Sequence, residues 1–180
     1  MPSTIFTRVS SVLAFACALP VAALAGDFPE GCYARAYSEA HLARNPRQSV
    51  TQMLVLAEPD PTELLDGQMF LKVQFRGQGI GVENAVPGGW YGQTLYCRVQ
   101  GGPTPPGWAK GGGIVCFAEC DGGAMQIASF TGDKLDLRTG GLFVDEAGGE
   151  CEGNTLLTAE GQQSVIFRLH PVDLDFCLNG

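Results

Sequence analysis

Apolar and polar residues alternate with a period of two along much of the chain, as they do in strands with one buried face. Residues 69–76 show this most clearly, because Leu71 and Val73 fall on one face and Lys72 and Gln74 on the other. This alternation, or a short apolar run bounded by turn residues, predicts further strands over residues 50–57, 90–100, 114–120, 124–130, 134–138, 142–144, 154–158 and 164–170. The chain is therefore expected to be mainly β.

Turn-forming sequences separate these strands at short intervals. Asp121-Gly122-Gly123 follows residues 114–120, and a second glycine-rich turn is expected at 139–141. Most connections are too short for anything but a hairpin, so we expect an antiparallel up-and-down sandwich or barrel of about eight short strands. A barrel would also leave no exposed strand edges.

Residues 32–44 are the only segment with helical spacing, because Tyr33, Tyr37 and Ala40 recur at i, i+4 and i+7. Pro46 would stop such a helix. We therefore expect one short N-terminal helix over residues 32–44, with a short strand ending near Tyr37 as the alternative.

The first 25 residues have the features of a secretory signal peptide. Arg8 supplies the positive charge, residues 12–24 form an apolar run, and small residues precede a cleavage site after Ala25. A membrane anchor is disfavoured because a spanning helix needs about 20 apolar residues. We expect removal of residues 1–25, a single β-rich domain over residues 26–180, and a periplasmic or secreted protein.

Lipid attachment at Cys17 is a further alternative that the sequence disfavours. The apolar run before this cysteine is short, and Phe15 is bulky for a processing site. Loss of Cys17 with the signal peptide leaves an even number of cysteines, which in an exported chain indicates disulfides rather than metal ligands or catalytic thiols. They are Cys32, Cys97, Cys116, Cys120, Cys151 and Cys177.

Hairpin geometry suggests one disulfide pairing directly. If the loop over residues 101–113 closes symmetrically, Cys97 faces Cys116 across the two strands. Cys116 and Cys120 would be about 13 Å apart in one extended strand, too far for a disulfide between them. Elimination then suggests Cys120–Cys151, and Cys32–Cys177 as a link between the two ends of the domain.

The mature chain is acidic. Loss of Arg8 leaves ten basic against 19 acidic side chains, a net charge of −9. Such a surface repels phosphate backbones and anionic lipids, so nucleic acid and bare anionic membranes are poor partners, and we expect no nucleic acid. An envelope or extracellular protein, or a small ligand, is the expected partner, and the oligomeric state is left open.

Catalytic residues are scarce. The chain has two histidines, His41 and His170, and none of its serines lies in a Gly-x-Ser-x-Gly turn. The alternative of a small hydrolase would use His170 with Asp173 or Asp175, and would need Ser129, Ser164 or a water beside the imidazole. We favour a protein without enzymatic activity and expect no cofactor.

A metal site has weak support. The cysteines are assigned to disulfides, and the two histidines lack ligand spacing. The acidic run over residues 145–152 is a weak calcium candidate, but it lacks the alternating ligands of calcium loops and is expected to be solvated. Its carboxylates belong to Asp145, Glu146, Glu150 and Glu152.

Three aromatic residues beside glycines and prolines are the best candidates for a binding surface. Trp90, Tyr91 and Trp108 lie next to or within loops, where aromatic side chains often anchor a partner or stack on sugar rings. The alternative is that these rings plug the end of the barrel. The sequence thus favours an exported, non-enzymatic binding module, inhibitor-like or ligand-binding, with a structural envelope component as another alternative.

Overall fold

A computed structural model describes residues 28–62, 64–77, 85–99, 113–146, 155–157 and 166–179. Within these residues the chain forms nine strands and two short helices. The elements are β1 (Gly31–Ala36), α1 (Glu39–Arg44), β2 (Val50–Pro59), β3 (Gly67–Phe75), β4 (Trp90–Val99), β5 (Ile114–Phe117), β6 (Gly123–Phe130), β7 (Leu135–Val144), β8 (Thr155–Leu157), β9 (Ile166–Val172) and α2 (Leu174–Asn179). The expected signal peptide lies outside the described residues.

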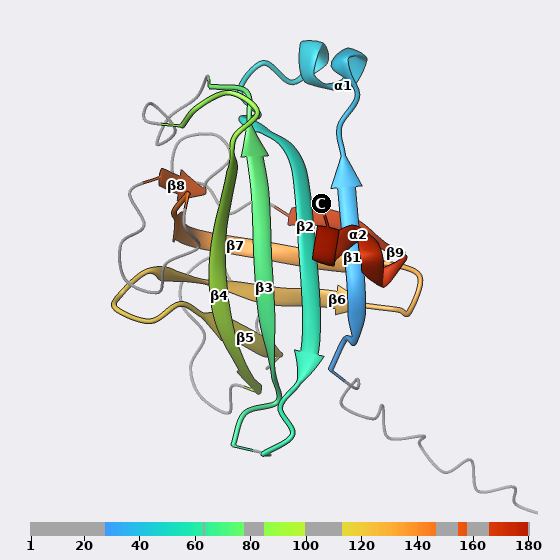
Figure 1. Ribbon diagram of the computed structural model, residues 1–180, viewed down its shortest axis with the longest axis vertical. Coiled ribbons are helices and arrows are strands. Elements are labelled where there is room, and N and C mark those ends of the chain that lie inside the picture. The colour runs from blue at the N-terminus through green and yellow to red at the C-terminus, as the bar shows by residue number, and fades with distance from the viewer. Residues whose placement is uncertain are drawn as a thin grey trace, which may run out of the picture.

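Eight of these strands close into an antiparallel barrel, which confirms the predicted fold class. Strands β1 to β7 pair in sequence order. β9 then lies between β7 and β1 and completes the ring. The short β8 pairs with the last part of β7. Figure 1 shows β1–β4 side by side at the front, with β6 and β7 running across behind them.

The barrel interior is filled by alternate side chains of each strand. In β3, Met69, Leu71, Val73 and Phe75 are all buried, as the sequence pattern predicted, and they join one continuous core cluster. Phe167 of β9 reaches the same cluster. Burying such side chains contributes about 1.5–3 kcal/mol each, so this packing is the main source of stability.

The predicted Cys97–Cys116 disulfide is confirmed. Cys97 of β4 lies directly opposite Cys116 of β5, and their sulfur atoms are 2.05 Å apart. Val99 faces Ile114 in the same register, as the symmetric hairpin predicted. Both cysteines are fully buried in the core, where they link two neighbouring strands of the barrel wall.

The helix predicted over residues 32–44 is wrong in its first half. Residues Gly31–Ala36 form β1, and only Glu39–Arg44 form a helix, with Ser38 as its N-cap. The strand prevails because β1 pairs with β2 on one side and β9 on the other, which satisfies its backbone groups. Over so short a segment, its apolar residues fit both helical spacing and strand alternation.

The turn predicted at residues 139–141 is also wrong, because β7 runs unbroken through it. Between Thr139 and Leu142 the strand has one residue more than β6, which makes a β-bulge. The bulge is possible because Gly123 of β6 has a φ of +92°, and a side chain there would collide with the carbonyl oxygen of Gly141. The glycines therefore bend the strand instead of reversing it.

The sequence suggested that Cys120 continues the strand that contains Cys116, but it does not. β5 ends at Phe117, and Cys120 and Asp121 adopt φ values of 54° and 60° in the turn that follows. Cys120 is disulfide-bonded. Its expected partner, Cys151, lies outside the described residues.

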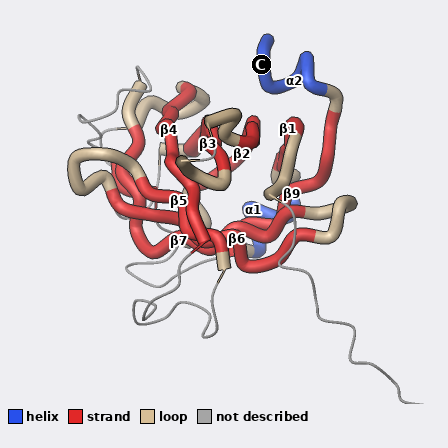
Figure 2. The backbone as a smooth tube through the Cα atoms, turned by 90° about the horizontal axis from the view of Figure 1, so that it is seen from below, coloured by secondary structure: helices blue, strands red, loops and turns tan. Residues whose placement is uncertain are grey.

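The C-terminal helix α2 was not predicted from the sequence. The predicted Cys32–Cys177 disulfide is confirmed, with sulfur atoms 1.97 Å apart, and it ties α2 to β1. α2 packs on β1 and β2 from outside the barrel, as Figures 1 and 2 both show. In the described part of the chain, neither helix is long and apolar enough to cross a membrane.

Removal of the central disulfide is expected to destabilise the barrel strongly. The double substitution Cys97→Ala/Cys116→Ala should lower the free energy of unfolding by about 2–5 kcal/mol, because the bridge restricts the unfolded chain. Urea denaturation of the oxidised wild type and the variant measures the difference. Equal unfolding midpoints would show that the bridge adds nothing to stability.

Candidate functional site on the outer face of the barrel

Tyr91, predicted as a contact residue, lies inside the barrel and is 1% exposed. Its ring packs against Phe75 at a centroid distance of 5.5 Å. Its hydroxyl accepts a hydrogen bond from the Val86 backbone at 2.7 Å and donates one to the Glu146 carboxylate at 3.0 Å. Burial raises the pKa of Tyr91 and Glu146 raises it further, whereas the Val86 N–H lowers it. Tyr91 therefore joins β4 to the chain after β7 from within.

Trp90, its neighbour, lies on the opposite face of β4. Side chains that face each other across paired strands share a face of the sheet. Trp90 pairs with Gln74 of β3, a half-buried residue on the side of β3 away from the core. Trp90 is itself half-buried. It is therefore an outer-face residue and the member of the predicted set that stays accessible.

The strand register defines the outer face of β1–β4 row by row. In one row Thr94 faces Phe70, Phe70 faces Leu56, and Leu56 faces Cys32. In the next row Gly92 faces Lys72, Lys72 faces Leu54, and Leu54 faces Ala34. Most of these positions are apolar, although a sheet face exposed to water normally carries polar residues.

Helix α2 covers one half of this apolar outer face. Cys32 and Leu54 are 3% and 1% exposed, yet neither belongs to the core cluster inside the barrel. Their burial fits the position of α2, which packs on β1 and β2 and is bonded to Cys32 through Cys177. The half on β3 and β4 remains uncovered, with Phe70 38% exposed.

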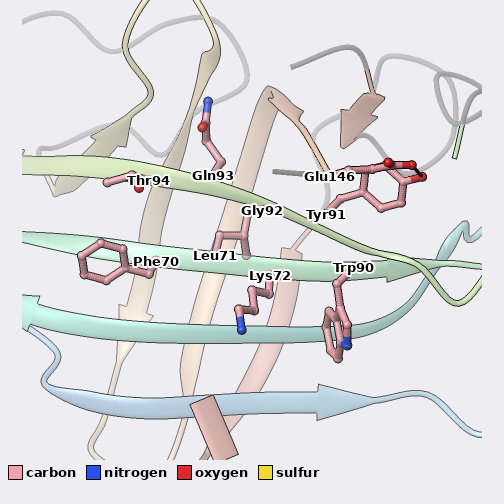
Figure 3. Close-up of a pocket in the computed structure, with 9 residues that line it drawn as sticks. All are labelled: Phe70, Leu71, Lys72, Trp90, Tyr91, Gly92, Gln93, Thr94 and Glu146. Atoms are coloured by element: carbon pink, nitrogen blue, oxygen red, sulfur yellow. Dashed lines mark hydrogen bonds between the residues drawn. The ribbon is translucent and has the colours of Figure 1, made fainter. Parts of the chain in front are cut away.

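The uncovered half contains a depression of about 230 Å³. Its lining consists of Phe70, Leu71, Lys72, Trp90, Tyr91, Gly92, Gln93, Thr94 and Glu146. Figure 3 shows Lys72 and Trp90 extending towards β2, whereas Tyr91 and Gln93 extend away from it. Gly92 has no side chain and is itself buried between Trp90 and Thr94. We take Phe70, Gly92 and Trp90, with Leu56 beside them, as the candidate binding surface.

Charged groups surround the candidate binding surface. Lys72 lies within it, and Glu146 lines its edge. Glu58 is exposed on β2, two residues beyond Leu56. A second depression of about 410 Å³ lies beside α2 and is lined by Asp173, Asp175, Phe176 and Asn179. Arg98 is exposed on β4, so the charges around the surface have both signs.

Among the described residues, no hydrogen bond joins the residues of the hydrolase alternative to one another. His170 is exposed, and its Nδ1 lies 3.3 Å from the carbonyl oxygen of Asp133. The Ser129 hydroxyl donates to Asp136 at 3.0 Å instead of to the imidazole. Asp173 and Asp175 lie at α2. Ser164 lies outside the described residues, as does the binding candidate Trp108.

The calcium candidates are only partly described. Asp145 forms a backbone bridge with Gly92, and Glu146 accepts the hydrogen bond from Tyr91. Glu150 and Glu152 lie outside the described residues. In the described part of the chain, no three histidine, cysteine or acidic side chains lie close enough together to hold a metal ion.

Phe70 and Gly92 were missed as site residues, although the sequence contains a signal for one of them. Phe70 occupies a polar-face position of an otherwise regular alternation, two residues before Lys72. A large apolar residue at such a position is a reason to suspect a contact surface. The role of Gly92 depends on which residues lie opposite it, and this register could not be read from the sequence.

The chain was also compared with known proteins. Comparisons with family models, curated sequences and solved structures found no match for this chain. The geometry of the outer face is therefore the basis for assigning a function.

An ion pair across β7 and β9 gives the protein a predictable response to acid. Arg168 donates to both oxygens of Asp136, at 2.8 and 2.9 Å, and this contact, with help from Ser129, lowers the Asp136 pKa. A lowered pKa stabilises the fold above the unfolded value of about 3.9. That stabilisation is lost as the pH falls through the folded value.

Asp136→Asn should therefore lower the free energy of unfolding at pH 7 by about 1 kcal/mol, since the exposed side of Arg168 is screened by solvent. The difference in unfolding free energy between wild type and variant should become smaller below about pH 4. Urea titrations at pH 7 and between pH 4 and pH 2 measure it. A gap that is constant over this range would contradict the assignment.

Proposed function

We propose that this protein is an exported binding module that acts without chemistry, and that it contacts its partner through the candidate binding surface. The observation that carries the proposal is the uncovered apolar half of the outer face, where Phe70, Trp90 and Gly92 line a depression. Aromatic residues around a depression are the usual anchors of protein interfaces. Trp108 remains a second candidate on sequence grounds.

The filled interior supports a surface role. Small ligands of β-barrels are commonly held in the lumen, but here Tyr91, Phe75 and Phe167 occupy it. A partner would therefore meet the outside of the wall. The two described disulfides suit an oxidising compartment, which supports the periplasmic or secreted location that residues 1–25 predict.

Truncation of Phe70 should weaken partner capture while leaving the barrel intact. The test is capture from an envelope or extracellular extract on immobilised wild type and Phe70→Ala, with quantitative mass spectrometry of the bound proteins. We expect at least a tenfold loss of a specific partner, the usual effect of removing an anchor side chain.

Phe143→Ala is the matched control, because Phe143 is 39% exposed against 38% for Phe70 and lies on β7. Both variants should melt at similar temperatures, and Phe143→Ala should retain the partner. Equal capture by the wild type and both variants would show that the candidate binding surface does not contact the partner. A much lower melting temperature for Phe70→Ala alone would show that Phe70 is a packing residue.

A further inference from the structure

We infer that the disulfide between Cys32 and Cys177 is a redox-sensitive latch. A dithiol that reduces it releases α2 and uncovers the β1–β2 half of the apolar outer face. The release follows from how α2 is attached, and it does not require a partner. The consequence for binding depends on the proposed function, because the uncovered half continues the candidate binding surface.

Helix α2 contributes a single buried side chain, that of Cys177. Every other residue from Pro171 to Asn179 is exposed. Even Phe176 and Leu178, on either side of Cys177, are 47% and 58% exposed. The helix has 6 residues, whereas an isolated helix needs about 12–15 residues to be stable in water. α2 therefore depends on its attachment to the barrel for both its shape and its position.

The helix covers apolar side chains that the barrel core does not use. α2 packs on β1 and β2 from outside the barrel, as Figures 1 and 2 show. Cys32 of β1 and Leu54 of β2 are 3% and 1% exposed, and neither belongs to the core cluster. Across the strands, Leu54 faces Lys72 of β3, and the neighbouring Leu56 faces Phe70. Release of α2 would therefore extend the apolar surface from β3 across β2 to β1.

The barrel does not need α2 to stay closed. β1 is paired with β2 along Gly31–Ala36, and it is paired with β9 on its other side. The core cluster lies on the inner side of β1, where Tyr33 belongs to it, and its described members include none from α2. Reduction of the latch should therefore free the helix and leave the barrel folded.

Exposure and position favour reduction of the latch over reduction of the disulfide in the core. Cys97 and Cys116 are both 0% exposed. A reductant can reach them only when the barrel opens. Cys177 is 8% exposed and lies near the end of α2, where helices fray. Because fraying of a helix end requires less free energy than unfolding of a barrel, the latch is reduced first.

The thiol–disulfide exchange is balanced by oxidation of the dithiol. One thiolate of the dithiol attacks the Sγ atom of Cys177, and Cys32 leaves as a thiolate. The second thiol of the reductant then displaces Cys177 and closes the reductant's own disulfide. The two cysteines gain two electrons and two protons, and the dithiol loses the same number.

Graded reduction under native conditions tests the latch. The oxidised wild type is treated with increasing dithiothreitol and quenched with an alkylating agent at set times, and peptide mass spectrometry measures alkylation at each cysteine. Cys32 and Cys177 should be reduced about tenfold faster than Cys97 and Cys116, because local opening is more frequent than global unfolding. Equal rates for the two disulfides, or faster loss of the one in the core, would overturn the inference.

A variant without the latch separates the release of α2 from reduction elsewhere in the chain. In Cys32→Ala/Cys177→Ala, NMR order parameters of the α2 backbone should fall from about 0.85 to below about 0.6, while those of the strands keep their wild-type values. Cys97→Ala/Cys116→Ala is the matched control, because it also lacks one disulfide but retains the latch, and its α2 should stay rigid. A rigid α2 in the variant without the latch, or an unfolded barrel, would show that the bond is not a latch.

A neutral apolar dye measures the uncovered face. Nile red should bind the variant without the latch several-fold more strongly than the wild type, since release of α2 exposes the apolar side chains of β1 and β2. Equal dye binding by a variant whose α2 is released would show that release uncovers no apolar surface.

Partner capture separates failure of the inference from failure of the proposed function. In the extract experiment, Cys32→Ala/Cys177→Ala should retain more of the partner that Phe70→Ala loses. Equal or weaker capture, with α2 released, would overturn the role of the latch in binding and leave the proposed function supported by the wild type. Capture that does not depend on Phe70, with or without the latch, would contradict the proposed function and leave the latch intact.

Discussion

The disulfide between Cys32 and Cys177 determines which part of the outer face stays open. Cys32 lies on the outside of β1, in the same cross-strand row as Leu56 and Phe70. Its bond to α2 places that helix over β1 and β2. Cys177 is the one buried residue of the helix, and its bond to Cys32 joins α2 to β1. The open apolar surface on β3 and β4 is what the helix leaves uncovered.

The proposed function follows from a division between the two faces of the barrel wall. Inward side chains fill the lumen and supply most of the stability. Tyr91 is an example, because its ring is buried and its hydroxyl makes two hydrogen bonds. The outward side chains are then free to vary. Around Gly92 several of them are apolar where water would favour polar groups, with Lys72 directly opposite.

The fold could be predicted from the sequence because short-range physics fixes most of it. Alternation in β3 and the symmetric hairpin around Cys97 and Cys116 depend only on the period of a strand and the pairing of neighbours. Long-range constraints caused the errors. β1 is a strand because β9 pairs with it, and β7 continues past Thr139 because β6 and β8 hold it. The site could be predicted only in part. Trp90 was identified from the sequence, whereas the position of Gly92 in the site depends on the strand register.

Disulfide mapping of the non-reduced mature protein by peptide mass spectrometry tests the account most directly. We expect one cross-linked peptide pair joining Cys32 to Cys177 and another joining Cys97 to Cys116, with no free thiol at these four positions. A free Cys177, or Cys32 bonded to any other cysteine, would leave α2 without its anchor. The outer face would then be arranged differently, and the surface on which the proposed function depends would not exist in this form.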